Sequence, residues 1–136
     1  MEWGDKKKMA VLLAVLIAVA TPIFLVTSPG LRTIRRCAEG HRESPWSVKW
    51  EYNIAGFYLN TMRPERALEC YNEIVNDPTW QKSDYVIAAY FGIARAYDEM
   101  GKKHMAMQCY AAFIASYPND PLAVDAERLM GSLQRL

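Results

Sequence analysis

The sequence predicts an all-α protein in which an N-terminal transmembrane helix precedes a two-repeat solenoid of helical hairpins and a C-terminal capping helix. Three observations support this fold class. An uncharged apolar run lies near the N-terminus, apolar residues recur at helical spacing in the rest of the chain, and two segments of that part resemble each other at a fixed offset. These patterns are typical of membrane helices, amphipathic helices and stacked repeats, respectively.

The apolar run occupies residues 9–28 and follows a short tail, residues 1–8, that contains three consecutive lysines. A run of about 20 apolar residues is long enough to cross a bilayer as one helix. A cleaved secretory signal is the alternative, because residues 18–20 read Ala-Val-Ala, which fits an A-x-A cleavage motif. We expect a retained single-pass anchor, and cleavage in the cell stays an open alternative.

Residues 29–44 are predicted to be a basic juxtamembrane linker. Arg32, Arg35 and Arg36 lie where their side chains could contact lipid phosphates, and each such cation contributes about 1 kcal/mol near an anionic surface. The lysines of the tail favour a cytoplasmic N-terminus, which would put the helical domain on the periplasmic or outer side. The arginines argue the other way, so a cytoplasmic domain is the alternative.

The better formed of the two hairpins spans residues 90–118. Its first helix carries an apolar stripe at i, i+3, i+4 and i+7, and Gly101 follows as a left-handed stop. Its second helix has its own stripe and ends before Pro118, because proline cannot continue a helix. The two stripes consist of Tyr90, Ile93, Ala94 and Tyr97, and of Ala106, Tyr110, Phe113 and Ile114.

A second copy of this hairpin occurs 39 residues earlier, where Ala67 corresponds to Ala106. The earlier copy is less regular. Met62 stands in the place of Gly101, and Glu51 stands where a large apolar residue is usual. The unit is a few residues longer than the roughly 34-residue period of one common helical repeat, and we place the extra residues in the connector near Trp80.

These positions resemble the signature of the tetratricopeptide repeat (TPR) family, in which small and aromatic residues alternate over two helices. The resemblance implies paired helices that stack around a shared core, and together with the apolar run it predicts a membrane-anchored small TPR protein. The matching residues are Ile54, Ala55, Tyr58, Ala67 and Tyr71 in the first copy, and Ile93, Ala94, Tyr97, Gly101, Ala106, Tyr110 and Pro118 in the second.

Helix starts are marked by capping residues throughout the predicted TPR domain, residues 45–136. Ser44 precedes Pro45, Ser83 precedes Asp84, and Asp120 precedes Pro121, each in an order that favours a helix N-terminus. Repeat one is expected over about 46–78 and repeat two over about 84–118. Residues 120–136 form a capping helix, which a solenoid needs to cover its last apolar face.

The resemblance also implies a partner-binding groove lined by the first helix of each repeat. By the layout of the family, the groove-facing positions here are Lys49, Tyr52, Gly56 and Leu59 in repeat one and Ala88, Phe91, Arg95 and Asp98 in repeat two. The five residues expected to contact a partner are Lys49, Tyr52, Leu59, Phe91 and Arg95. The two aromatic residues, Tyr52 and Phe91, could instead pack in the core, and the sequence leaves both readings open. The basic and asparagine set of chaperone-binding members is absent, so no chaperone-tail clamp is predicted.

The composition and the absence of certain motifs argue against nucleic-acid binding, catalysis and metal binding. Up to Ser44 there are seven basic and four acidic residues, and from Pro45 onward nine basic and eleven acidic, so no basic surface for nucleic acid is expected. There is no nucleophile with a partnered base, no glycine-rich phosphate loop and no histidine–cysteine spacing for a metal. We predict no enzymatic activity, no cofactor, no metal and no small-molecule substrate.

Two functions follow from these expectations. In the first, the chain is a scaffold: a single-pass TPR subunit or assembly factor of an integral membrane complex, with protein subunits and the lipid bilayer as partners. In the second, it is a signal-processed or freely anchored periplasmic adaptor that binds peptides transiently.

Overall fold

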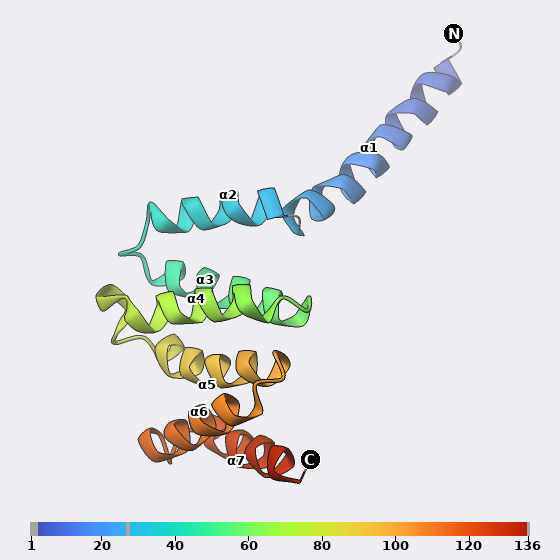
Figure 1. The fold of residues 1–136 in the computed structure, drawn as a ribbon. Coiled ribbons are helices and arrows are strands. Elements are labelled where there is room, and N and C mark those ends of the chain that lie inside the picture. The colour runs from blue at the N-terminus through green and yellow to red at the C-terminus, as the bar shows by residue number, and fades with distance from the viewer. Residues whose placement is uncertain (1–2, 27, 136) are drawn as a thin grey trace. The chain divides into compact units, whose positions relative to one another are not determined.

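The computed structural model describes residues 3–26 and 28–135; the side chains of residues 3–7, 21–26, 28–29 and 38 lie outside this description as well. Within these residues the chain is entirely helical, with seven α-helices and no strand (Figure 1). The chain divides into two compact units, residues 1–37 and residues 38–136. The helices are α1 (Trp3–Val26), α2 (Ser28–Glu39), α3 (Pro45–Asn60), α4 (Pro64–Asn76), α5 (Asp84–Glu99), α6 (Lys103–Ser116) and α7 (Pro121–Gln134).

The first unit contains α1 and most of α2. The described apolar side chains of α1 are exposed to between 54% and 65%: Met9, Val11, Leu12, Leu13, Val15, Leu16, Ile17 and Val19. Among the residues that the structure describes, no helix has both the length and the apolar character needed to span a membrane. The transmembrane helix predicted over 9–28 is therefore not found there, and residue 27 of that span lies outside the description.

A helix replaces the predicted linker. Residues 28–39 form α2, with Pro29 in its first turn, where the missing amide hydrogen of proline breaks no helical bond. Leu31 and Ile34, spaced i and i+3, are buried and half-buried, whereas Arg32 and Arg36 are exposed. This amphipathic spacing explains why the segment is helical, although the sequence predicted a basic juxtamembrane linker.

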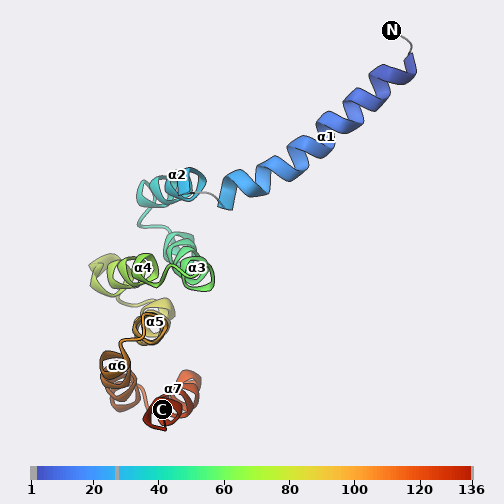
Figure 2. The same ribbon diagram turned by 45° about the vertical axis from the view of Figure 1, so that its right-hand side comes forward.

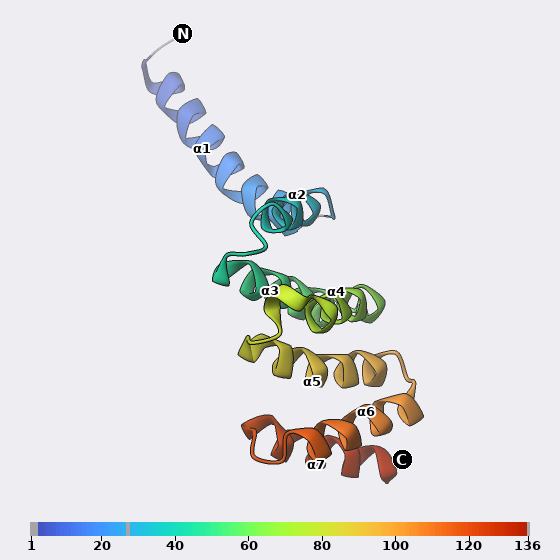
Figure 3. The ribbon, with the colours of Figure 1, turned by 90° about the vertical axis from the view of Figure 1, so that its left-hand side faces the viewer.

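The second unit is a stack of helices in which chain neighbours pack together. Figure 2 shows α3 and α4 as one pair, with α5, α6 and α7 following, and Figure 3 shows the same succession from the side. The small signature residues lie where helices approach closely, because Ala55, Ala67, Ala94 and Ala106 are each 0% exposed. The predicted hairpins are thus present as α3–α4 and α5–α6.

Each hairpin turns through one left-handed residue. Gly101 has φ +71°, and the amide of Lys102 donates to the carbonyl of Tyr97 at 2.9 Å, as in a Schellman C-cap. Met62 has φ +59° at the equivalent place, and the amide of Arg63 donates to the carbonyl of Tyr58 at 2.9 Å. The first repeat therefore keeps the turn geometry of the second without its glycine.

The connector between the repeats is ordered by a polar cluster. A short 3₁₀ helix, Pro78–Trp80, buries the Trp80 indole, whose Nε1 donates to the carbonyl of Arg42 at 2.9 Å. The Arg42 guanidinium donates in turn to the carboxylate of Asp77 at 2.9 Å. The chain before α3 is thereby fixed to the end of α4.

The last helix closes the core of the second repeat. Asp120 caps α7 by accepting a hydrogen bond from the amide of Leu122 at 2.9 Å. Buried residues of α7 then join those of α5 and α6 in one hydrophobic cluster, which contains Phe91, Ala94, Ala106, Tyr110, Phe113, Ala123, Ala126 and Leu133.

Candidate protein-binding groove

A groove lies along α3 where this helix meets α4 and α5. Its volume is ≈ 390 Å³, and one residue from each of α4 and α5 completes a wall made mostly by α3. One helix can supply most of this lining because residues three, four and seven apart lie on the same face of a helix. The lining residues are Tyr52, Asn53, Gly56, Phe57, Leu59, Asn60, Tyr71 and Arg95.

Three of the five groove residues predicted from the sequence meet here: Tyr52, Leu59 and Arg95. Lys49 is exposed on α3 but does not line the groove. Asn53, Asn60 and Phe57 were not predicted. Asn53, Phe57 and Asn60 are spaced at i, i+4 and i+7 on α3, and this shared helix face is the signal that could have identified them.

Phe91 belongs to the core, which answers one question that the sequence left open. Its side chain is 8% exposed, and its ring centroid lies 5.8 Å from that of Tyr110 and 5.7 Å from that of Phe113. Tilted aromatic pairs at such distances are typical of packed interiors. The placement of Phe91 in the groove is therefore corrected.

Tyr52, the other open case, is half-buried between two aromatic neighbours. Its ring centroid lies 5.8 Å from that of Tyr71 and 5.4 Å from that of Tyr85. The Tyr71 ring in turn covers Gly92, where a Cβ atom would come within 2.5 Å of the ring. A side chain at position 92 would push against the Tyr71 ring, which forms part of the groove wall. The repeat pattern alone did not indicate this preference for glycine.

The phenol groups of the groove stay neutral over an extended pH range. Burial raises the pKa of Tyr71 to about 12 and also raises the pKa of Tyr52, while the positive charge of Arg95 acts in the opposite direction on both. Neutral hydroxyl groups can donate and accept hydrogen bonds at physiological pH. The groove therefore offers the half-buried phenol of Tyr52 beside one permanent cation, whereas Tyr71, which is 3% exposed, forms part of its wall.

Arg95 is exposed, and its guanidinium forms no hydrogen bond or ion pair with any residue that the structure describes. Asp98 and Glu99 lie three and four residues further along α5, at spacings where ion pairs commonly form on a helix. Neither forms a short-range ion pair with Arg95, but the positive charge of Arg95 does act on the Asp98 carboxyl, where it partly offsets the rise in pKa that burial causes. A guanidinium with five N–H donors is thus available at the groove.

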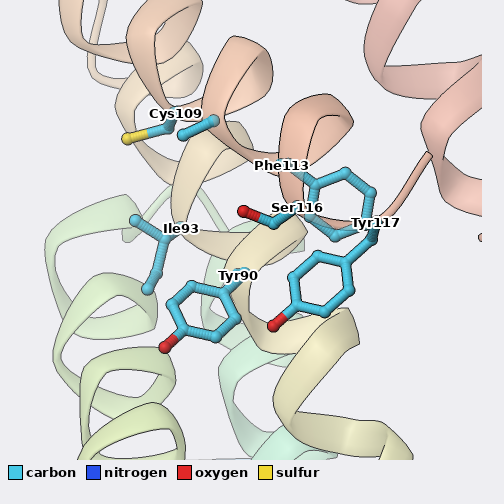
Figure 4. A pocket seen from close by; sticks show the side chains of 7 residues that line it. Tyr90, Ile93, Cys109, Phe113, Ser116 and Tyr117 are labelled. Carbon is cyan, nitrogen blue, oxygen red and sulfur yellow. The ribbon is translucent and has the colours of Figure 1, made fainter.

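A second cavity, of ≈ 280 Å³, lies between α5 and α6. Figure 4 shows the side chains of Tyr90, Ile93, Cys109, Phe113, Ser116 and Tyr117 gathered around it. The rings of Tyr90 and Tyr117 lie 6.2 Å apart at their centroids. Burial raises the pKa of the Cys109 thiol, which keeps it protonated and less reactive.

The remaining predicted contact residues lie in the first unit. Arg32 and Arg36 are exposed on α2, and Arg35 is half-buried there. Within the described part of the chain, no group of three or more histidine, cysteine or acidic residues is arranged to hold a metal ion.

Comparison with known families agrees with the repeat geometry. The family model described as tetratricopeptide repeat matches residues 88–120, which span most of α5, all of α6 and the turn that leads to α7. This match supports the TPR family for the hairpin that carries the more regular signature. Searches of curated proteins and of solved structures found no match.

Proposed function

We propose that this chain is a non-enzymatic scaffold protein whose helical unit binds a partner protein in the groove along α3. The observation that carries the proposal is the meeting of the half-buried Tyr52 and the exposed Arg95 in one groove, whose lining also includes Leu59, a core residue that is 4% exposed. The repeat match at residues 88–120 supports it as well, because arrays of such hairpins present extended binding surfaces.

The chemistry of the groove suits protein recognition. It combines aromatic rings, two asparagine amides and one arginine, and such residues provide contact area together with hydrogen bonds to a peptide backbone. The interior of the unit is filled by packed side chains, so the open groove is where a partner could add contacts without displacing the core.

Site-specific photocrosslinking in cells tests this proposal. A photoreactive amino acid at Asn60, in the groove, should crosslink a defined partner protein, and the same group at Ser116, in the second cavity, is the matched control. A partner captured from Ser116 and not from Asn60 would move the binding site to the second cavity. Absence of a defined adduct at both positions would contradict the scaffold function.

We further propose that the scaffold is anchored as a single-pass subunit or assembly factor of a membrane complex, with its N-terminus in the cytoplasm. The uncharged sequence of residues 9–26 and the exposed apolar side chains of α1 support this anchoring. The chain should stay in the membrane pellet after alkaline washing, and native mass spectrometry in mild detergent should detect it with partner subunits. Release by the wash, or migration only as a monomer, would favour the periplasmic adaptor instead.

A further inference from the structure

We infer that the partner segment bound by the groove is an acidic peptide that also carries large apolar side chains. This inference rests on the proposed function and specifies the chemistry of the partner. It is carried by two observations: the charge of the groove, and an exposed pair of tryptophans on the same helix.

The groove is cationic and lacks acidic side chains. Arg95 is the one charged residue among those that line it. On α3 itself the charged residues are Lys49, which is exposed, and Glu51, which is 3% exposed. A ligand in this groove therefore meets a cation and hydrogen-bonding groups, and no carboxylate lines it, although Asp98 lies one turn from Arg95 on α5 and interacts with it electrostatically.

Arg95 differs from the arginines that the unit pairs internally. Arg66 bonds Glu69 at 3.0 Å and Arg128 bonds Asp125 at 2.9 Å, each within one helix turn. Arg95 has Asp98 at the same spacing but does not bond it. Because an arginine fork matches a carboxylate with two parallel hydrogen bonds, an acidic side chain is its best complement.

The apolar part of the surface begins at the start of α3. Trp46 is 40% exposed and Trp50 is 47% exposed, although both belong to the apolar spacing of this helix. Trp46 and Trp50 lie on the same face of α3 as two residues of the groove lining, Asn53 and Phe57, because consecutive members of this set are three or four residues apart. We call Trp46, Trp50 and the lining residues of the groove the α3 surface.

An acidic peptide fits this surface better than a lipid headgroup does. Tryptophans with a nearby cation such as Lys49 also suit a membrane interface. However, the unpaired Arg95 borders a groove of ≈ 390 Å³, a volume that accommodates side chains of a peptide. Exposed tryptophans and arginines are also the residues that most often dominate the energetics of protein interfaces.

Selection from a phage-displayed library of random peptides tests the inference. The baits are the full-length chain and its Arg95→Glu and Lys82→Glu variants, which change the net charge equally at a lining residue and at an exposed residue outside α3 and the groove lining. Peptides selected by the unmodified chain should be enriched in aspartate or glutamate beside aromatic or aliphatic residues. Arg95→Glu should bind those peptides roughly five- to tenfold more weakly and select lysine or arginine instead, whereas Lys82→Glu should keep the original preference.

A second pair of variants tests the tryptophans. Trp50→Ala should weaken binding of the selected acidic peptides, whereas Tyr90→Ala, which truncates another exposed aromatic residue at the second cavity, should not. Both variants change exposed side chains, and circular dichroism would verify that each is folded.

The outcomes separate this inference from the scaffold function. Selected peptides without acidic residues, or acidic peptides held equally by Arg95→Glu, would overturn the inference and leave the scaffold function standing. If no peptide is selected and the chain instead binds vesicles of anionic lipid through Trp46 and Trp50, both the inference and the scaffold function at this groove would be contradicted.

Discussion

At the scale of single residues, the turn of the first repeat contains a strained methionine. Met62 adopts φ +59° and is 81% exposed, so it contributes little packing to offset its left-handed backbone. For residues with a Cβ atom this conformation costs about 1–2 kcal/mol, whereas glycine adopts it freely. Gly101 has the same role in the second repeat, and a Cβ there would meet no atom within 4 Å.

We therefore expect Met62→Gly to stabilise the protein by about 0.5–1 kcal/mol, after the extra unfolded-state entropy of glycine is subtracted. The reverse change, Gly101→Met, should destabilise by about 1–2 kcal/mol, and its cost should come from the backbone because the space there is open. Urea denaturation of both variants measures the two free energies. A loss of stability in Met62→Gly would show that the methionine side chain contributes contacts that outweigh its strain.

The raised pKa of Tyr71 predicts a specific alkaline behaviour. In the unfolded chain this phenol ionises near its ordinary pKa of 10.0, and in the folded chain near about 12. The folded state thus holds the proton more tightly, so the stability due to the neutral phenol is complete below pH 10 and is lost as the pH rises towards 12. We expect the free energy of unfolding of the unmodified chain to fall over this range.

Tyr71→Phe removes that phenol and should make this alkaline loss of stability smaller. In a titration followed by tyrosinate absorbance, the variant should lose a component near pH 12. If Tyr71→Phe instead loses absorbance near pH 10, the Tyr71 hydroxyl is exposed to solvent and the description of the groove wall is wrong.

The sequence predicted the burial of some residues but not of others, depending on whether their packing is set by the repeat spacing or by residues distant in the sequence. Repeat spacing located Ala94, Ala106 and Tyr110 correctly because small and aromatic residues at those positions have one packing solution, and all three are 0% exposed. Spacing could not decide between groove and core for Phe91. That choice depends on Tyr110 and Phe113 of α6, which surround the ring and are distant from it in sequence.

At the scale of elements, local signals predicted where the helices of the second unit begin. Pro45, Pro64 and Pro121 each open a helix, as expected for proline in a first turn. The connector was less predictable. Its order depends on hydrogen bonds between Arg42 and the region of Trp80, which join residues 35 and 38 positions apart in the sequence.

The connector supplies a prediction about stability. Asp77 is 8% exposed and accepts hydrogen bonds from the Arg42 guanidinium at 2.9 Å and from the amide of Thr79 at 2.8 Å. Asp77→Ala leaves both donors without this partner and should destabilise the protein by about 1–3 kcal/mol. Asp125→Ala is the matched control, because it removes an exposed pair with Arg128, which is worth about 1 kcal/mol or less.

Thermal unfolding of both variants would measure this difference. Equal, small shifts in Tm for Asp77→Ala and Asp125→Ala would mean that the connector does not depend on the Arg42–Asp77 pair. The same measurement on Trp80→Phe should also give a loss, because the smaller phenyl ring leaves a buried void and lacks the hydrogen bond to the carbonyl of Arg42.

At the scale of the whole molecule, the chain consists of two units with different surfaces. Residues 1–37 expose the apolar side chains of α1, and residues 38–136 bury a continuous core and leave a polar, aromatic groove open. The repeat period predicted the stacking of the second unit because each hairpin can bury its apolar stripe only against a neighbour. The helix α2 was not predicted, because its amphipathic pattern covers only about three turns and the segment is rich in arginine.

The groove along α3 is the central claim, and the asparagines of the chain allow a direct measurement of it. Asn53 and Asn60 line the groove, whereas Asn72, Asn76 and Asn119 do not. In the full-length chain labelled with ¹⁵N at asparagine, addition of a peptide selected by that chain should shift the side-chain amide signals of Asn53 and Asn60 alone. Shifts of Asn119, or of none of the five, would contradict binding at this groove.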